Sequence, residues 1–212
     1  EKLAALGQVT AGIAHEIRNP LTAMKMTLQI LLDAEPPGDR RESLSVVLKE
    51  TERLQLTVDG LLAYAKPPAL SLAPGDLNDV VRGALGVLDA QVKHVGVLLE
   101  SRLGELPRVS LDAPRMHQVV VNLLLNAVQA AGAGGHVQVT TESVGGEVRL
   151  SVTDSGPGIP VEARSHIFEP FYSTKTGGIG LGLAVSKRLV DDHGGRLAFD
   201  GTPGRTTFTV TL

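Results

Sequence analysis

Apolar and small residues in the first part of the chain recur in alternating steps of three and four, the heptad spacing of helices that pack along a narrow seam. One series stands at Leu3, Leu6, Thr10, Ile13, Ile17, Met24 and Leu31, and a second at Leu44, Val47, Thr51, Leu54, Val58, Leu61 and Ala65. The run Glu35-Pro36-Pro37-Gly38-Asp39 separates them. The pattern predicts helices over about residues 3–32 and 41–65, which form an antiparallel hairpin.

A hairpin with such narrow seams buries little apolar area alone. We therefore expect two copies to pair into a four-helix bundle, which makes the protein a homodimer. Lys66-Pro67-Pro68 ends the second helix because proline disrupts a helix interior. These boundaries predict a helical hairpin over residues 1–66, a linker over 67–75 and a second domain over 76–212.

The second domain mixes helical patterns with alternating ones. Helices are expected from Asp76 or Asn78 to His94, from Asp112 to Ala131, and over a segment that ends near Gly194. Strands are expected over residues 97–102, 137–141, 148–152, 196–200 and 206–212, with Gly145-Gly146 joining two of them as a hairpin. Helices interspersed with hairpin-linked strands are typical of an α+β fold, here an α/β sandwich.

Composition narrows the functions open to this fold. The hydrophobic content of 42% and the mean hydropathy of +0.11 suffice for a buried core. With 20 Lys and Arg against 23 Asp and Glu, a net charge of −3 and 3% aromatic residues, the chain lacks the basic field and stacking platforms that nucleic acids need. The lack of cysteine excludes disulfides, thiolate zinc sites and cysteine nucleophiles, and it fits a reducing compartment.

No apolar run approaches the roughly 18–20 residues that cross a bilayer. We expect no membrane contact by this segment and a cytoplasmic location. The chain begins in the middle of a predicted helix and without methionine, at Glu1-Lys2-Leu3. We therefore expect a fragment that lacks upstream sensing or membrane-anchoring segments.

A polar cluster, His15-Glu16-Ile17-Arg18-Asn19-Pro20, lies within the first predicted helix. If Leu3 is an a position of the heptad, His15 is an f position, so its imidazole faces away from the seam. A neutral imidazole is a competent nucleophile near neutral pH, and Glu16 can take or orient its ring proton. Pro20 should bend or loosen the helix just beyond.

Two other interpretations of His15 exist. A lone exposed histidine usually has no special role. The pair His15-Glu16 also resembles the start of a zinc-hydrolase motif, but Asn19 stands where that motif has its second histidine, which argues against zinc hydrolysis.

Asn122 and Asn126 lie one turn apart on the helix that starts at Asp112, so both amides project from one face. In such an apolar run, two amides are costly unless they are hydrogen-bonded or hold a ligand. They are either structural amides or part of an oxygen-lined site for Mg²⁺ with phosphates.

Two glycine-rich segments follow. In Asp154-Ser155-Gly156-Pro157-Gly158, a carboxylate and spaced glycines let the backbone approach a ligand, although a tight turn is the alternative. The run from Gly177 to Leu183 opens a helix whose N–H groups and dipole favour a phosphate. It lacks the third glycine of the Rossmann fingerprint, and the chain has no Walker-type Gly-Lys-Ser/Thr, which excludes a P-loop.

Five motifs together resemble those of the sensor histidine kinases of two-component systems. They are His-Glu-Ile-Arg-Asn-Pro-Leu at 15–21, Asn-Leu-Leu-Leu-Asn-Ala at 122–127, Asp-Ser-Gly-Pro-Gly-Ile at 154–159, Phe-Glu-Pro-Phe at 168–171 and Gly-Ile-Gly-Leu-Gly-Leu at 178–183. The likeness covers nearly the whole chain. The Ala-Gly-Ile-Ala before His15 makes the chain look most like the nitrogen-regulation-type branch.

The resemblance implies a dimerisation and histidine-phosphotransfer hairpin followed by a Bergerat-fold (GHKL) ATP-binding domain, with ATP and Mg²⁺ as cofactors. It implies that His15 takes the γ-phosphoryl group and passes it to an aspartate of a response regulator receiver domain. Glu16 would be the base. Asn19 would position water for dephosphorylating that partner.

In the ATP-binding domain, the resemblance implies that Asn126 ligates Mg²⁺ with support from Asn122 and that Asp154 accepts from the adenine amino group. The remaining implied residues are Gly156 and Gly158 around the base, Phe168 and Phe171 as lid anchors, Lys175 near the phosphates, and Gly178, Gly180 and Gly182 as a hinge. Core packing is the alternative for the two phenylalanines. The family's final Gly-x-Gly-Thr box reads Gly204-Arg205-Thr206-Thr207 here, without the second glycine, and Thr206 is its expected nucleotide-site residue.

Two other functions stay open at this stage. One is an ATP-sensing dimer or partner phosphatase without autokinase activity, against which the intact His15, Glu16 and Asn126 argue. The other is a chaperone-like or repair-type ATPase of the same superfamily, in which the hairpin would have no purpose. Whether phosphorylation occurs within a protomer or across the dimer depends on the handedness of the turn at Pro36-Pro37-Gly38, which the sequence does not determine.

Overall fold

The computed structural model describes residues 2–65, 70–175, 178 and 180–212, and for residues 2–16, 18, 53, 56–57 and 59–65 it describes the backbone alone. Two compact units make up the chain, Glu1–Pro68 and Ala69–Leu212. No helix within this described part is long and apolar enough to cross a membrane.

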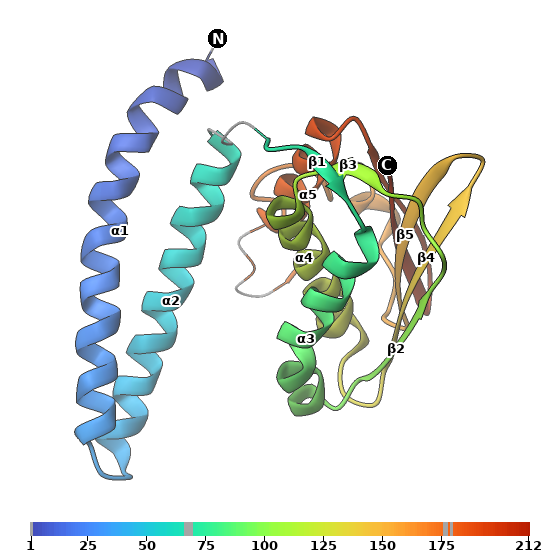
Figure 1. Ribbon diagram of the computed structural model, residues 1–212. Helices are drawn as coiled ribbons and strands as arrows, with labels where there is room; N and C mark the ends of the chain where they lie inside the picture. Colours follow the sequence, from blue (N-terminus) through green and yellow to red (C-terminus); the bar gives the residue numbers. More distant parts are fainter. Residues whose placement is uncertain (1, 66–69, 176–177, 179) are drawn as a thin grey trace. The chain divides into compact units, whose positions relative to one another are not determined.

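The first unit is the predicted antiparallel hairpin, α1 (Lys2–Ala34) followed by α2 (Asp39–Ala65) (Figure 1). At its turn, the guanidinium of Arg41 donates to the backbone carbonyls of Leu32 and Glu35, the latter at 2.7 Å. Carbonyls at the end of a helix lack partners within that helix. One cation from α2 therefore satisfies the end of α1 and fixes the direction in which the chain returns.

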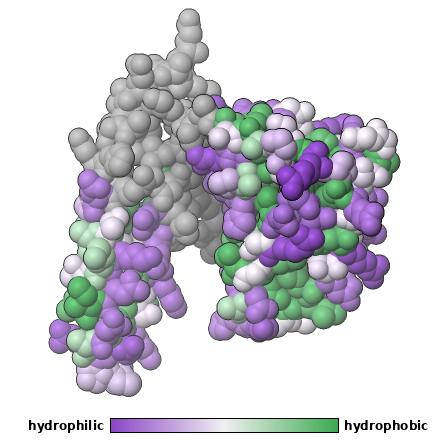
Figure 2. Space-filling model, in the orientation of Figure 1, coloured by the Kyte–Doolittle hydropathy of each residue, from purple (hydrophilic) through white to green (hydrophobic). Residues whose placement is uncertain are grey.

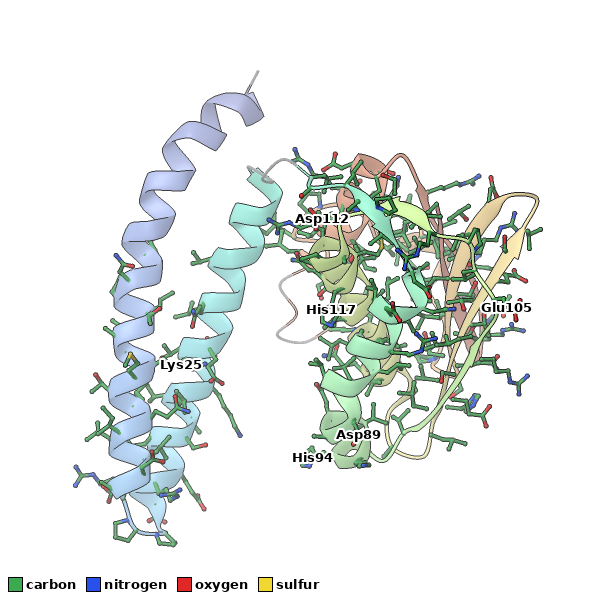
Figure 3. The ribbon with its side chains drawn as sticks, in the orientation of Figure 1. Lys25, Asp89, His94, Glu105, Asp112 and His117 are labelled. Carbon is green, nitrogen blue, oxygen red and sulfur yellow. The ribbon has the colours of Figure 1, made fainter. Side chains whose placement is uncertain are left out.

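Many of the hairpin's described apolar side chains are exposed. Among its described side chains, Leu21 and Thr51 are buried, and an ion pair of 2.9 Å joins Lys25 on α1 to Glu52 on α2 (Figure 3). Large apolar side chains at predicted heptad positions are instead between 40% and 54% exposed, at Ile17, Met24, Leu31, Val47 and Leu54. Figure 2 shows apolar surface between the polar side chains of the hairpin's described part. The described large apolar residues of the predicted seam are therefore mostly uncovered, although Thr51 of the same series is buried.

The second unit is a five-stranded sheet with helices on one face (Figure 1). The strand order is β2-β4-β5-β7-β6, in which β2 and β4 are parallel and the other neighbours antiparallel. The strands are β2 (Leu98–Leu103), β4 (His136–Val144), β5 (Glu147–Asp154), β6 (Arg196–Thr202) and β7 (Arg205–Thr211), and the helices are α3 (Leu77–Val95), α4 (Ala113–Ala131) and α5 (Gly182–Asp192). This arrangement confirms the predicted α+β fold.

The two faces of the sheet differ as the alternation of the strands predicts. On the covered face, Leu150 at the centre of β5 is fully buried. On the uncovered face, hydroxyl groups pair across the strands, Ser151 with Thr209 at 3.2 Å and Thr153 with Thr207 at 2.9 Å. The apolar core of this unit therefore lies between the sheet and its helices.

Three short elements were not predicted. β1 (Ala73–Gly75), within the segment that the sequence assigns to the linker, pairs antiparallel with β3 (Val109–Leu111). A 3₁₀ turn, η1 (Val161–Ala163), follows β5. Strands of three residues, one of them with a proline, are too short to show an alternating pattern.

Asp112 joins three segments at the start of α4 (Figure 3). Its carboxylate accepts from the backbone N–H of Arg115 at 3.1 Å, which caps the helix, and from that of Ser71 at 2.9 Å. Its own N–H donates to Nε2 of His193 at 3.0 Å, so the ring donates through Nδ1 to the carbonyl of Leu189 at 2.6 Å. The hydrogen bond from Ser71, above all, holds the pKa of the Asp112 carboxyl below its ordinary value, with burial opposing and Arg115 assisting.

We expect Asp112→Ala to lower the free energy of unfolding by about 1–3 kcal/mol at pH 7, because two backbone donors lose their acceptor. A carboxyl whose pKa is lower in the folded state stabilises the fold above its ordinary pKa of 3.8 and loses this effect as the pH falls. The difference from wild type should therefore shrink below about pH 4. Urea unfolding followed by circular dichroism at several pH values measures it.

The control is Asp89→Asn, which removes an exposed ion pair with Lys93 and should cost less than about 0.5 kcal/mol. Equal losses of unfolding free energy in the two variants would contradict a stabilising role for the hydrogen bonds of Asp112.

Candidate functional site

Asp154 ends β5 with its side chain on the helix-covered face, where it is 3% exposed. Its Oδ1 accepts a hydrogen bond from the backbone N–H of Gly156 at 2.9 Å. Burial raises the pKa of the Asp154 carboxyl, while the Gly156 hydrogen bond and the positive charge of Lys175 oppose the rise. The strand therefore ends in a buried acceptor whose charge the protein stabilises only in part.

Thr206 faces the same site from the neighbouring strand. In the register of β5 and β7 it lies directly opposite Asp154, and it is 4% exposed. Opposite residues of an antiparallel pair share one face of the sheet. Thr207 points to the uncovered face, where it bonds Thr153. The shortened glycine box thus still brings one threonine to the side of the carboxylate.

Gly156 and Gly158 let the loop after β5 run close to its neighbours. A Cβ atom on Gly156 would lie 2.7 Å from the carbonyl oxygen of Ala130, near the end of α4. One on Gly158 would lie 2.5 Å from the carbonyl oxygen of Thr202, and Gly158 has a φ of 87°, which favours glycine. Larger residues do not fit at either position, because the backbone of this loop lies close to that of Ala130 and of Thr202. The predicted approach of this loop to a ligand stays a prediction.

Arg164 holds the same loop and carries no signal in the sequence. Its Nε donates to the carbonyl of Ile159 at 3.2 Å, and its Nη2 donates to the carbonyl of Gly201 on β6. A single arginine beside a 3₁₀ turn has no periodic pattern, so sequence reasoning could not distinguish it from a solvated surface residue. It joins the loop of Gly158 to the far edge of the sheet.

The two asparagines of α4 have different partners. Nδ2 of Asn122 donates to the carbonyl of Gly182 and to the hydroxyl of Ser186, each at 3.4 Å. These long hydrogen bonds connect α4 to the first turn of α5. Ser186, which is fully buried, was not predicted to take part.

Asn126 and Gln129 bind the side chain of Lys175. The ammonium Nζ of Lys175 donates to Oδ1 of Asn126 at 2.9 Å and to Oε1 of Gln129 at 2.8 Å. Desolvation lowers the pKa of Lys175, and the charge of Asp154 opposes that change. The structure therefore brings three predicted residues, Asn126, Asp154 and Lys175, into one electrostatic group, together with Gln129, which the sequence analysis missed.

The two phenylalanines of the predicted lid differ. The ring of Phe168 lies 5.9 Å from that of Phe199, centroid to centroid, so it packs onto the sheet. Phe171 is 59% exposed and has a φ of 65°, which is unusual for a residue other than glycine. Phe168 therefore has the packing role that the sequence left open, and Phe171 does not.

The glycines before α5 are not equivalent. A Cβ atom would lie 2.4 Å from Oγ of Ser173 if placed on Gly178, and 2.4 Å from the carbonyl oxygen of Tyr172 if placed on Gly180, whose φ is 72°. On Gly182, the nearest atom would be 3.9 Å away, in Asn122. Gly180 is therefore required by its positive φ and its backbone contact, whereas the hydroxyl of Ser173 could rotate away from a side chain at Gly178, and Gly182 begins α5. Gly177 and Ile179 lie outside the described residues.

The predicted residues of the hairpin are only partly described. His15 and Glu16 belong to α1, but their side chains lie outside the described residues. Asn19 and Pro20 are exposed, and α1 continues through Pro20. In the part of the chain that the structure describes, no group of three or more His, Cys, Asp or Glu residues is placed to hold a metal ion.

Two family profiles match the chain. One, described as "His Kinase A (phospho-acceptor) domain", matches residues 5–70, and the other, described as "Histidine kinase-, DNA gyrase B-, and HSP90-like ATPase", matches residues 111–212. The first includes His15, and the second includes every site residue named above in the sheet unit.

Individual proteins agree with these profiles. Sensor histidine kinase ZraS of Escherichia coli (strain K12) is 40% identical over 215 residues, which cover 100% of this chain and 46% of ZraS. The crystal structure of full-length ShkA in complex with AMPPNP has a TM-score of 0.83 at 29% identity, over 97% of this chain and 45% of that one. Histidine kinase ThkA in complex with response regulator protein TrrA has a TM-score of 0.74 at 30% identity, over 100% of this chain and 63% of that one. The chain spans about half the length of ZraS and of the other curated relatives most similar to it.

We expect Asp154→Asn to raise the unfolding temperature at pH 7 by about 2–4 °C, because it removes a buried charge and keeps an acceptor for Gly156. A carboxyl whose pKa is raised in the folded state costs stability once the pH exceeds its ordinary pKa of 3.8. The gain should therefore grow from about pH 4 to pH 7. Differential scanning calorimetry measures it, with the exposed Asp200→Asn as control. A lower unfolding temperature for Asp154→Asn at pH 7 would show that the negative charge of Asp154 does not destabilise the fold.

Proposed function

This chain belongs to the sensor histidine kinase family, and on that premise we propose that it phosphorylates its own His15 with ATP and transfers the phosphoryl group to an aspartate of a response regulator. The observation that carries the proposal is the convergence of Asp154, Thr206 and the side-chain oxygen of Asn126 in the unit that matches an ATPase profile. The other unit matches a phospho-acceptor profile that includes His15. The sheet unit would bind ATP, the phosphoryl donor, and the hairpin would supply His15, the phosphoryl acceptor.

Asp154 is suited to recognise adenine. A carboxylate accepts hydrogen bonds, and the exocyclic amino group of adenine donates them. Gly156 uses Oδ1 at 2.9 Å, which leaves Oδ2 for the ligand. Gly156 and Gly158 would leave room for the flat base beside this carboxylate, and the hydroxyl of Thr206 would line the same pocket.

The phosphate end of the nucleotide would lie toward Asn126 and Lys175. Mg²⁺ prefers oxygen ligands, and Oδ1 of Asn126 already binds a cation, the Lys175 ammonium, at 2.9 Å. This oxygen is therefore suited to bind Mg²⁺, and we take Asn126 as the protein ligand of the ion. When bound, Mg²⁺ would neutralise charge on the phosphate oxygens. Asn122 would support the site by holding the first turn of α5, whose N–H groups favour an anion.

The lid segment would complete the phosphate end. Lys175 can contact the phosphates as a point charge once it leaves α4. Gly178 and Gly180 keep this segment compact beside it, and Gly182 begins the helix whose positive end would favour the phosphates. Phe168 anchors the segment to the sheet.

The transfer step uses His15 as the nucleophile. Its imidazole nitrogen forms a bond to the γ-phosphorus as the bond to the bridging oxygen breaks, and that electron pair leaves with ADP. Glu16 takes the ring proton. In the second step, an aspartate oxygen of the receiver domain attacks the phosphorus, and the imidazole leaves and regains a proton.

A second activity is proposed from Asn19. Its side chain is exposed on α1, one turn beyond His15. An amide there can position a water for attack on the phosphorylated aspartate of the bound regulator. The complex of ThkA with TrrA shows that a similar kinase binds a response regulator, which supports the same class of partner here.

A homodimer through the hairpin accounts for the uncovered seam. Ile17, Met24 and Leu31 of α1 are between 40% and 54% exposed although they repeat with heptad spacing. A second hairpin would bury them in a four-helix bundle. We retain the functional limits 1–66, 67–75 and 76–212 as a proposal. A cytoplasmic location follows from the proposed reaction, because ATP and regulator are intracellular.

We expect the wild-type chain to incorporate the γ-phosphate of radiolabelled ATP in an acid-labile, base-stable form and His15→Ala to incorporate none, because the nucleophile is missing. The control is His94→Ala, which removes an exposed histidine at the end of α3 and should label as wild type does. Label that persists in His15→Ala, or an ATP-binding wild type that takes up no label, would refute the kinase.

We expect Met24→Glu to convert a dimer into a monomer at micromolar concentration, because it places a charge in the apolar seam. Sedimentation equilibrium measures the mass. Gln29→Glu introduces the same residue at an exposed f position of α1 and should leave the dimer intact. A monomeric wild type, or a Met24→Glu dimer of unchanged affinity, would exclude this seam as the interface.

A further inference from the structure

Gln129, which no sequence motif singles out, binds the same ammonium group as Asn126. Nζ of Lys175 lies 2.9 Å from Oδ1 of Asn126 and 2.8 Å from Oε1 of Gln129. Residues three apart share one face of a helix. An ammonium group only donates hydrogen bonds, so both carboxamides present their oxygens to it. α4 therefore offers two converging oxygens to a cation.

Asn126 and Gln129 are the residues of this part of α4 that accept hydrogen bonds from Lys175. Ala127 and Val128, which lie between them on α4, are buried and carry no side-chain acceptor. Asn122, one turn before Asn126, is directed to the first turn of α5 instead. The negative charge of Asp154 also attracts Lys175 but forms no direct hydrogen bond with it among the described residues.

The Asn126 oxygen cannot serve the lysine and Mg²⁺ at once. Mg²⁺ would lie about 2.0–2.1 Å from its oxygen ligand and keep several water molecules. The ammonium nitrogen lies 2.9 Å from that same oxygen, within the space of those waters, and the two positive charges would repel at so short a separation. Lys175 must therefore leave Asn126 before Mg²⁺ can bind there. Gln129 opposes that departure because it supplies a second acceptor for the ammonium.

We propose that Gln129 is a positioning residue that holds the Lys175 ammonium against Asn126 and thereby sets the Mg²⁺ concentration at which the chain binds ATP. The inference rests on the proposed function, because it takes Asn126 as the Mg²⁺ ligand. Gln129 acts only through Lys175. A stronger hold on the lysine raises the Mg²⁺ requirement, and a weaker hold lowers it and releases the lysine toward the phosphates.

The test measures ATP binding directly and needs no catalytic turnover. Binding of a fluorescent ATP analogue to the full chain is followed as Mg²⁺ is added, for wild type, Gln129→Met, Lys175→Met and the double variant. Methionine keeps the approximate size of glutamine and removes its acceptor oxygen. We expect Gln129→Met to lower the Mg²⁺ concentration for half-maximal binding by about three- to tenfold, the effect of one charge-assisted hydrogen bond at an exposed site.

The lysine background separates positioning from a general structural effect. In Lys175→Met, the further change Gln129→Met should leave the Mg²⁺ midpoint where it was, because the group that Gln129 acts upon is gone. The matched control is Gln138→Met on β4, whose side chain is on the uncovered face of the sheet between the buried Val137 and Val139. It should not change the midpoint. Gln129→Ala removes the same oxygen and should shift the midpoint in the same direction as Gln129→Met.

Each outcome decides a separate point. An unchanged or higher Mg²⁺ midpoint in both Gln129 variants overturns the inference, and so does a lower midpoint that persists in the Lys175→Met background. A wild type that binds no ATP at any Mg²⁺ concentration overturns the proposed function itself and the inference with it. ATP binding that requires Mg²⁺ in wild type, combined with unaltered midpoints in the Gln129 variants, leaves the proposed function intact and overturns the role of Gln129 alone.

Discussion

The hydrogen bonds of the Asp112 carboxylate fix the first turn of α4, the helix that carries Asn122, Asn126 and Gln129. A helix advances about 100° per residue, as 3.6 residues make a turn. With this period, the burial of side chains such as Leu123, which is fully buried, leaves Asn122 facing α5 and Asn126 facing Lys175. The same carboxylate also binds the backbone just before β1. The position of the linker's end and the geometry of the site thus share one acceptor.

The site itself works against the stability of the unit that contains it. Asp154 is buried and Lys175 is exposed, and desolvation shifts the pKa of each toward its neutral form, upward for the carboxyl and downward for the ammonium. Each partly compensates the other, and Asn126 and Gln129 add neutral acceptors for the lysine. This arrangement keeps two charges poised next to a glycine-lined loop. A ligand that carries a hydrogen-bond donor at one end and negative charge at the other would relieve both.

The sequence predicts the larger elements well because each of them has many residues in one period. The hairpin, α3, α4 and the long strands all show the 3.6-residue or two-residue repeat that burial of one face requires. β1 and β3 have three residues each, so they have no period to detect. Their pairing depends on a tertiary contact between segments more than thirty residues apart, which local patterns do not encode.

The candidate site divides in a similar way. Residues within dense motifs, such as Asp154 and Asn126, could be identified from their neighbours and from the family resemblance. Thr206 points to the site because side chains alternate between the two faces of β7. The alternating pattern of β7 contains this information, but the incomplete glycine box at residues 204–207 drew attention away from it. Arg164 and Gln129 could not be found, because an isolated polar residue has the same sequence pattern whether it binds a loop carbonyl, a lysine or water. The roles of His15, Glu16 and Asn19 remain predictions.

The hydroxyl pairs on the uncovered face of the sheet have a consequence for how this unit can evolve. Because Ser151, Thr153, Thr207 and Thr209 satisfy one another, the sheet needs no second layer of helices, and the unit has a single apolar core. Asp154 and Thr206 stand in that core's outermost row, on the same strands and the same face as its packed side chains. A substitution at Asp154 or Thr206 that changes ligand preference would therefore also change the packing of the core. Substitutions at these two positions must preserve the stability of the fold. Specificity can change at lower cost in the loops and at the polar residues of α4 that face the site.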